Sequence, residues 1–139
     1  MKSRVFSFLK YNRFEFGEQT VSQFVIFECK WLFSIIIFYF HKSDSSQDRF
    51  HTHAFNAISF KIFGEYDEQI LLEEDTGSFV IKNRKNILQY FPRNSYHRIS
   101  RSTGCMTLLL SGPWKRKWKE YVNGEVVEYT WGRKNNYGN

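Results

Sequence analysis

Three histidines of the sequence have the spacing of metal ligands. His51 and His53 are two residues apart, so in an extended strand both imidazoles point to the same side. His97 follows a turn-like segment at 92–96 and begins another apolar run, so antiparallel pairing can bring it across from the first two. Three neutral imidazoles leave coordination positions open for water, dioxygen or substrate. The sequence therefore predicts a divalent metal site at His51, His53 and His97.

Six further residues are candidates for the wall of the same pocket. Ser59 and Lys61 share strand parity with the histidine pair, so they are expected to face the same interior. An arginine at the mouth of a pocket would hold a carboxylate or phosphate with two hydrogen bonds. The alternative for each arginine is an ordinary surface position. The six candidates are Asn56, Ser59, Lys61, Arg84, Tyr96 and Arg98.

Two other groups of polar residues are expected to have structural roles. His41 adjoins the polar loop 42–49, whose groups it is expected to hydrogen-bond. Glu65, Tyr66 and Glu68 have the chemistry of acid–base groups, but in a hairpin we expect them to be solvated turn residues.

The composition favours strands over helices, with 15 Phe, 8 Tyr and 4 Trp and only 2 Pro. Asn123-Gly124 is typical of a tight hairpin turn. Short strands bounded by turn residues suit a sandwich or a small barrel, so the predicted fold class is all-β. The apolar runs predict strands near 4–9, 21–28, 31–41, 54–63, 65–72, 78–82, 86–90, 97–101, 105–110, 114–122 and 125–131.

The length of 139 residues fits one domain, which we place at 1–132, followed by a flexible tail at 133–139 that lacks apolar anchors. A net charge of +6 favours anionic ligands but is not that of a dedicated nucleic-acid binder. The segment 114–119 alternates tryptophan with basic residues and could stack on a single strand. We expect it instead to bury tryptophan and expose lysine, so nucleic acid is not an expected partner.

The sequence also bears on the compartment. Cys29 and Cys105 stand far apart without a zinc-knuckle spacing, which favours free thiols in a reducing compartment. The first 16 residues are charged and aromatic, unlike a secretion signal. The longest apolar run, 31–40, is shorter than the roughly 20 residues that span a bilayer. We therefore expect a cytoplasmic protein, in the host cytoplasm if a phage encodes it, with no membrane partner.

The histidine motifs resemble those of the cupins. The first cupin motif is a histidine pair, then a glutamate, then a closing glycine, and His51-Thr52-His53 and Gly64 match it, with Ala57 at the glutamate position. The second motif runs from a proline through a glycine to a histidine, and residues 92–97 reproduce it with Asn94 in place of the glycine. Asparagine tolerates the positive φ that a glycine would supply there.

A longer stretch, from Phe40 to about Trp131, is similar to a group of small, mostly uncharacterised cupin-like proteins of bacterial and phage genomes. That group commonly has Pro-Trp-Asp after its histidine pair, where this chain has residues 54–56, Ala-Phe-Asn. The segments that match are Phe40-His41, Ser43-Asp44, Asp48-Arg49, His51-Thr52-His53, residues 64–68, His97-Arg98, residues 107–110, and residues 111–113 leading to Lys117-Trp118.

The resemblance implies a cupin-type double-stranded β-helix, a jelly-roll barrel, in which the three histidines alone bind the metal ion. This ligand set resembles that of cupins without the acidic ligand, including the thiol dioxygenases. It implies Fe(II) before Mn, Ni or Zn, and a non-haem metal-dependent oxygenase or dioxygenase acting on a small polar or anionic substrate.

Two other functions stay open because a fold does not dictate a function. One is a metal-free sugar-nucleotide epimerase or isomerase, in which a histidine is the general base and Tyr66 or Tyr96 the acid. The other is a non-catalytic module that binds a small anion or a host protein, with the basic segment 115–119 as a surface. By analogy with cupins, the apolar region 5–40 could also form a homodimer by strand exchange.

Overall fold

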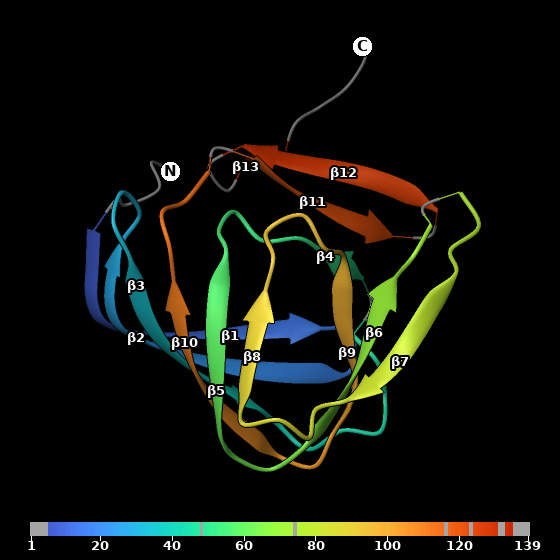
Figure 1. The fold of residues 1–139 in the computed structure, drawn as a ribbon, viewed down its shortest axis with the longest axis horizontal. Coiled ribbons are helices and arrows are strands. Elements are labelled where there is room, and N and C mark those ends of the chain that lie inside the picture. The colour runs from blue at the N-terminus through green and yellow to red at the C-terminus, as the bar shows by residue number, and fades with distance from the viewer. Residues whose placement is uncertain are drawn as a thin grey trace.

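The computed structural model describes residues 6–47, 49–73, 75–115, 117–122, 124–130 and 133–134, with only the backbone of Val122, Arg133 and Lys134. Its strands form two antiparallel sheets that face each other (Figure 1). The first sheet has the order β1 (Phe6–Phe16), β2 (Gln19–Cys29), β3 (Ser34–Phe40), β10 (Cys105–Ser111), β5 (Ala57–Phe63), β8 (Leu88–Phe91). The second has the order β13 (Arg133–Lys134), β12 (Glu125–Thr130), β11 (Lys117–Val122), β4 (Phe50–His51), β9 (His97–Ser102), β6 (Tyr66–Leu71), β7 (Phe79–Asn83).

The all-β jelly roll predicted from the sequence is confirmed, although several strand ends differ. β1 was expected to end at residue 9 but runs to Phe16, because an edge strand keeps its polar side chains in solvent and needs no continuous apolar run. Val122 pairs with Glu125, which confirms the hairpin, although Asn123 lies outside the described residues. Arg133–Lys134 pair with β12, so the sheet continues two residues into the predicted tail, and 135–139 lie outside the described residues.

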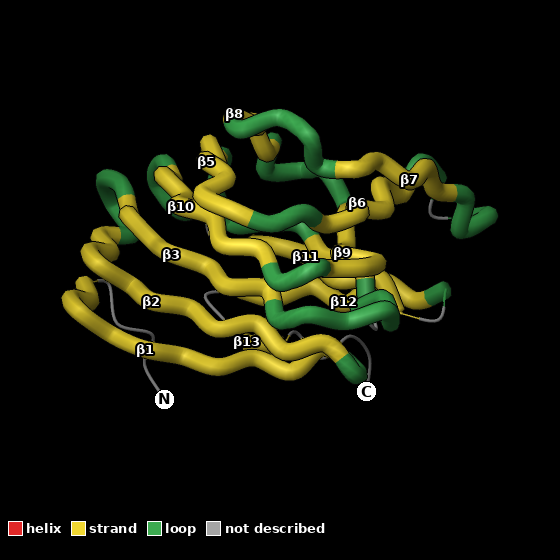
Figure 2. Tube along the Cα trace, turned by 90° about the horizontal axis from the view of Figure 1, so that it is seen from below, coloured by secondary structure: helices red, strands yellow, loops and turns green. Residues whose placement is uncertain are grey.

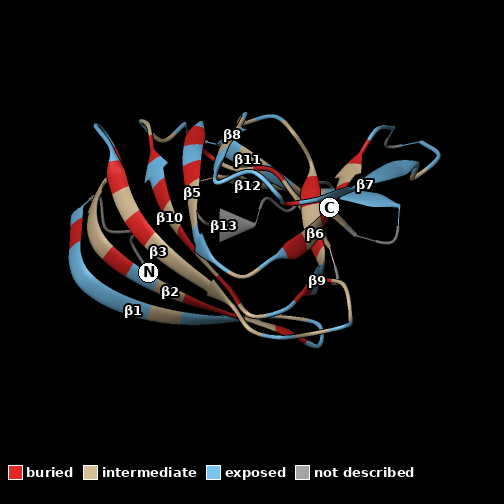
Figure 3. Ribbon diagram, turned by 60° about the horizontal axis from the view of Figure 1, so that its bottom comes forward, coloured by how far each residue is buried: buried red, intermediate tan, exposed pale blue. Residues whose placement is uncertain are grey.

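Alternation along the strands builds the core between the two sheets (Figure 3). The main buried cluster comes from the first sheet and from the segment between β4 and β5, and it contains Val25, Ile36, Ala54, Phe55, Ala57 and Leu109. Trp114 and Trp118 pack against it, as the alternation in 114–119 predicted. Cys29 and Cys105 are free thiols, as expected. The described residues include no helix long and apolar enough to cross a membrane.

The strand β1 forms one edge of the first sheet (Figure 2). Its side chains are mostly exposed, including the apolar Phe6, Phe8 and Tyr11. The backbone of Leu9 has a φ of 48°, a left-handed conformation that bulky residues rarely adopt. The pairing with β2 passes from Phe8 to Lys10, so the regular ladder is interrupted at Leu9.

Gly64, the closing glycine of the first motif, occupies a position that accepts no side chain. Its φ is +82°, and an added Cβ would overlap the backbone of Gly104 and Cys105. In contrast, Asn94 does not reproduce the positive φ of the glycine it replaces, because Leu9 alone among the described non-glycine residues has one. The second motif therefore makes its turn with ordinary backbone geometry.

We expect Gly64→Ala to destabilise the protein by about 3 kcal/mol, since it combines backbone strain with a clash against a rigid strand. Gly124→Ala is the matched control: Gly124 has the same φ of +82°, but nothing lies within 4 Å of an added Cβ. That variant should lose only about 1 kcal/mol. Urea unfolding of both variants measures the difference, and equal losses would contradict the clash.

Candidate metal centre

The three histidines come together through one short strand pairing. His51 ends β4 and lies directly opposite His97 of β9. His53 follows β4, where its backbone amide donates to the carbonyl of Arg93 at 3.2 Å. Between them, the amide of Thr52 donates to the carbonyl of Lys119 in β11 at 2.8 Å. These backbone bonds keep the segment extended, so both imidazoles turn to the same side, as the sequence predicted.

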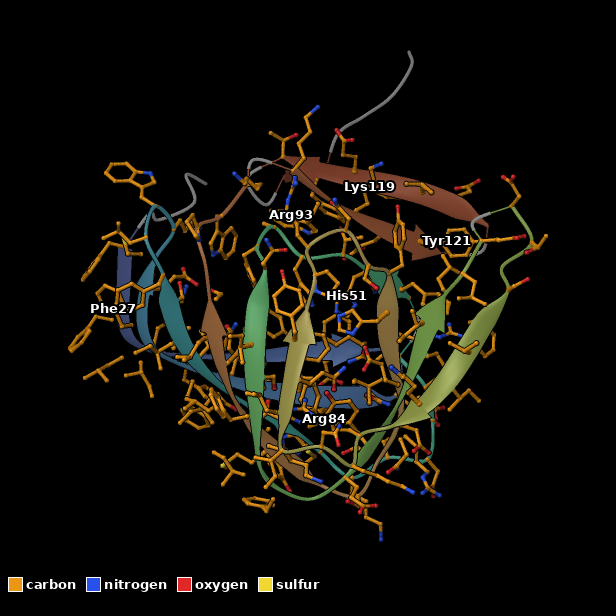
Figure 4. All side chains as sticks on the ribbon, viewed as in Figure 1. Phe27, His51, Arg84, Arg93, Lys119 and Tyr121 are labelled. Carbon is orange, nitrogen blue, oxygen red and sulfur yellow. The ribbon has the colours of Figure 1, made fainter. Side chains whose placement is uncertain are left out.

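The imidazoles face one another inside the barrel. One nitrogen from each of His51, His53 and His97 lies within 4.8 Å of the others, and Nε2 of His53 is 2.7 Å from Nε2 of His97. Nitrogens bound to one first-row ion lie about 3–4 Å apart, because each bond is about 2.1 Å long. Figure 4 shows His51 in the middle of the molecule, below the β11–β12 hairpin. Small side-chain rotations would bring all three nitrogens onto one ion.

The carboxylate of Glu68 fixes the orientation of His97. Glu68 Oε1 lies 2.7 Å from His97 Nδ1, and Gln89 Nε2 donates to Glu68 Oε2 at 3.1 Å. A carboxylate at Nδ1 selects the tautomer whose proton is on Nδ1, which leaves the Nε2 lone pair directed at the centre. Burial has the largest single effect and raises the pKa of Glu68, but the hydrogen bond and charge of His97, the hydrogen bond from Gln89 and the charge of Arg84 together leave that pKa below its ordinary value.

The other two histidines are held neutral, the form that ligates metals. Burial, followed by the nearby His97, lowers the pKa of His53 to about 3. Burial and the charges of His97 and His53 lower the pKa of His51 well below its ordinary value. Among the described residues His51 Nδ1 has no hydrogen-bond partner although it is buried. A buried nitrogen left without a partner is costly unless something else satisfies it, so this donor set fits a metal ion.

The histidines line a cavity of about 290 Å³ between the sheets. Its wall is mainly aromatic, and its acidic residues are Glu28 and Glu120. Glu120 Oε2 accepts hydrogen bonds from Arg49 and from the hydroxyl of Tyr129. No lysine or arginine of the described chain is among its lining residues. The aromatic residues of the wall are Phe14, Phe16, Phe38, Phe40, Phe55, Tyr66, Phe91, Trp114 and Trp118.

Of the six candidates for the pocket wall, Ser59 lines the cavity and the other five lie away from it. Lys61 instead donates from Nζ to the carbonyl of Arg84 at 3.2 Å, near the register shift between β5 and β10. Asn56 accepts a hydrogen bond from the backbone of Arg93 at 2.7 Å through Oδ1. Tyr96 precedes β9 and is not part of the cavity wall.

The two arginines proposed as anion clamps have structural partners. Arg84 is 3% exposed and donates to Ser59 Oγ, to Tyr66 Oη and to the carbonyl of Ser59 at 2.7–3.1 Å. It is therefore a cross-link behind the cavity wall, and Figure 4 places it further from the β11–β12 hairpin than His51. Arg98 donates to Gln69 Oε1 at 2.7 Å and lies 4.3 Å above the ring of Phe50. Neither reaches the cavity, and neither is an ordinary solvated arginine.

Two sequence-based expectations were wrong. Glu68 is not a solvated turn residue: it is 3% exposed, because it lies within β6 and not in the turn before it. Tyr66 is buried too, beside Arg84. His41 bonds Ser22 Oγ of β2 at 2.8 Å rather than the polar loop, because β3 carries it alongside β2. Steps of two back from Ile70 reach Glu68 and Tyr66, and this pattern could have placed Glu68 within a strand.

Comparisons with known proteins support the fold. No family model and no curated protein matches the sequence. Oxalate decarboxylase from Bacillus subtilis aligns with 82% of this chain and 30% of its own, at 15% identity and a TM-score of 0.52. Another structure of that enzyme, with the same coverage, identity and TM-score, is described as having Mn(II) centres. The EutQ protein of Clostridium difficile aligns with 75% of this chain and 80% of its own, at 17% identity and a TM-score of 0.54.

The chain thus spans about a third of the oxalate decarboxylases and most of EutQ. At these identities the likeness concerns the fold. Together with the two antiparallel sheets, it identifies the fold as a jelly-roll barrel of the cupin type, inside which three histidines form a group that could hold a metal ion.

Proposed function

We propose that the protein binds one divalent metal ion at His51, His53 and His97 and acts on a small molecule as a non-haem metal-dependent enzyme of the oxygenase or dioxygenase type. The observation that carries the proposal is the convergence of three imidazoles on the wall of a cavity. A divalent ion held there would polarise a substrate oxygen or, if redox-active, activate dioxygen.

The chain's own residues would prepare the site for that chemistry. The low pKa of His53 and of His51 keeps their lone pairs available at neutral pH. Glu68 holds His97 with its Nε2 toward the centre. The aromatic wall limits water around the reacting atoms, which strengthens electrostatic interactions in the cavity.

The identity of the metal is proposed on two grounds. The sequence resemblance implies Fe(II) first, whereas a structural neighbour is described with Mn(II) centres. Three nitrogens with open positions suit either ion, and also Ni(II) or Zn(II). We therefore propose Fe(II) or Mn(II) as the ion that supports turnover.

The metal-free epimerase is less well supported. Tyr66 receives a hydrogen bond from Arg84, and burial raises its pKa, which makes it a weak acid. Tyr96 lies away from the cavity, and the described wall offers no lysine or arginine for a diphosphate. The absence of lysine and arginine from the described wall also argues against a non-catalytic module that binds a small anion without a metal ion. A host-protein partner, a homodimer and a cytoplasmic location stay predictions.

The test is reconstitution of the tag-free protein with Fe(II), Mn(II), Ni(II) and Zn(II), followed by elemental mass spectrometry and thermal unfolding. We expect about one ion per chain and a higher melting temperature, both reversed by a chelator, because binding to the folded state stabilises it. Folded protein that stays empty with all four metals would refute the proposal. Metal binding without oxygen consumption across a substrate screen would leave a metal-binding module instead.

A further inference from the structure

We propose that the cavity beside the histidines takes an uncharged, largely apolar molecule of one or two rings, in place of the polar or anionic substrate predicted from the sequence. This inference deepens the proposed function, on which it rests for the claim that such a molecule is the substrate. Binding of the apolar molecule to the cavity does not require the metal ion, so it can be measured in metal-free protein.

The wall gives the first argument. Aromatic side chains from several elements line the cavity, among them Phe38 and Phe40 of β3, Phe91 of β8, and Trp114, which follows β10. The aliphatic side chains Ile36 and Leu109 fill the spaces between them. Aromatic side chains bury large apolar areas and favour stacked or edge-to-face contact with another ring. An apolar ring would therefore find favourable contacts on several sides.

The charges give the second argument. Two arginines near the wall already have partners: Arg84 donates to Ser59, Tyr66 and a loop carbonyl, and Arg49 donates to the wall residue Glu120 at 3.4 Å. The charged side chains that do line the cavity are carboxylates, of which Glu28 has a pKa raised by burial. A dicarboxylate would bring its own negative charges beside them, and the described wall offers no lysine or arginine to pair with those charges. Desolvating such charges without partners is strongly unfavourable.

The size gives the third argument. At about 290 Å³ the cavity is roughly twice the 150 Å³ of an engineered apolar cavity that binds benzene. One or two fused rings would fill it. A donor atom on such a ring could then reach the cluster of His51, His53 and His97, which forms part of the same wall.

Indole, indole-3-carboxylate and oxalate are suitable probes. The first two differ by one carboxylate, and oxalate is a small dicarboxylate without a ring. We would titrate each into metal-free and Zn(II)-loaded protein and follow the heat of binding. In metal-free protein we expect saturable indole binding with a Kd below about 1 mM, at least about tenfold tighter than indole-3-carboxylate, and no measurable oxalate binding. Metal content is measured on the same samples, so failure of the metal site and failure of this inference are distinguished.

Two matched variants locate the bound indole. Phe38→Leu removes a ring from the wall, and Phe24→Leu makes the same change on the neighbouring strand at an exposed position outside the lining. We expect Phe38→Leu to weaken indole binding about fivefold and Phe24→Leu to leave it unchanged. Absence of indole binding by folded protein, equal or tighter binding of the anions without metal, or equal effects of the two variants would overturn the inference.

Discussion

Loss of either His51 or His97 is expected to lower the affinity for Fe(II), Mn(II) or Zn(II) by more than about 100-fold, since removing a ligand costs more than removing the partner of a ligand. His51→Ala and His97→Ala should therefore emerge from desalting without metal, whereas the parent protein retains about one ion per chain. Competition with a chromophoric chelator measures the affinities, and elemental mass spectrometry measures the content.

His41→Ala is the control for these variants. His41 is the fourth histidine of the chain, but it bonds Ser22 and lies outside the group of converging imidazoles. This variant should keep the metal. If His51→Ala and His97→Ala fold and still bind one ion as tightly as the parent, the site lies elsewhere.

Removing the carboxylate of Glu68 is expected to weaken metal binding without removing a ligand. Glu68→Leu abolishes the hydrogen bond to His97 Nδ1 and should cost about 100-fold in affinity. Glu68→Gln keeps an acceptor but loses the charge, so we expect about tenfold. Nitrogen-15 NMR of metal-free protein adds a second measurement: His97 should hold its proton on Nδ1 in the parent and shift toward a tautomer mixture in Glu68→Leu.

Glu65→Gln serves as the matched control, because Glu65 is exposed and directly precedes β6, the strand that carries Glu68. It should change neither the affinity nor the tautomer. If Glu68→Leu binds metal like the parent while the His97 tautomer is unchanged, Glu68 has only a packing role.

Much of the fold was predictable because local patterns and tertiary structure agree. The apolar runs of β5 and β10, each flanked by turn residues, suffice to indicate these strands. The edge strand β1 was cut short because its exposed second half alternates Lys10, Asn12 and Arg13 with apolar residues. The two-residue strand β4 carries no periodic signal at all, and tertiary pairing with β9 and β11 creates it.

The residues of the candidate site that short sequence motifs encode were predictable. His51 and His53 are two residues apart, so strand geometry predicts that their imidazoles share one side of the strand. His97 could be predicted as the third ligand because it begins another strand. The partner of His97 was not predictable, because Glu68 reaches it only through the register of β6 against β9. The same holds for Arg84, whose burial depends on several carbonyls and hydroxyls that no sequence pattern brings together.

The left-handed backbone at Leu9 has a consequence for how separate copies of the molecule meet. An edge strand of eleven residues with exposed apolar side chains could be a template onto which a second chain adds its own strand, and further chains could follow. At Leu9 the left-handed backbone interrupts the pairing ladder, which resumes in the same register at Lys10, so we expect the edge to be a poorer template at this residue. The strain of about 1–2 kcal/mol in a bulky residue thus lowers folding stability slightly and hinders edge-to-edge polymerisation.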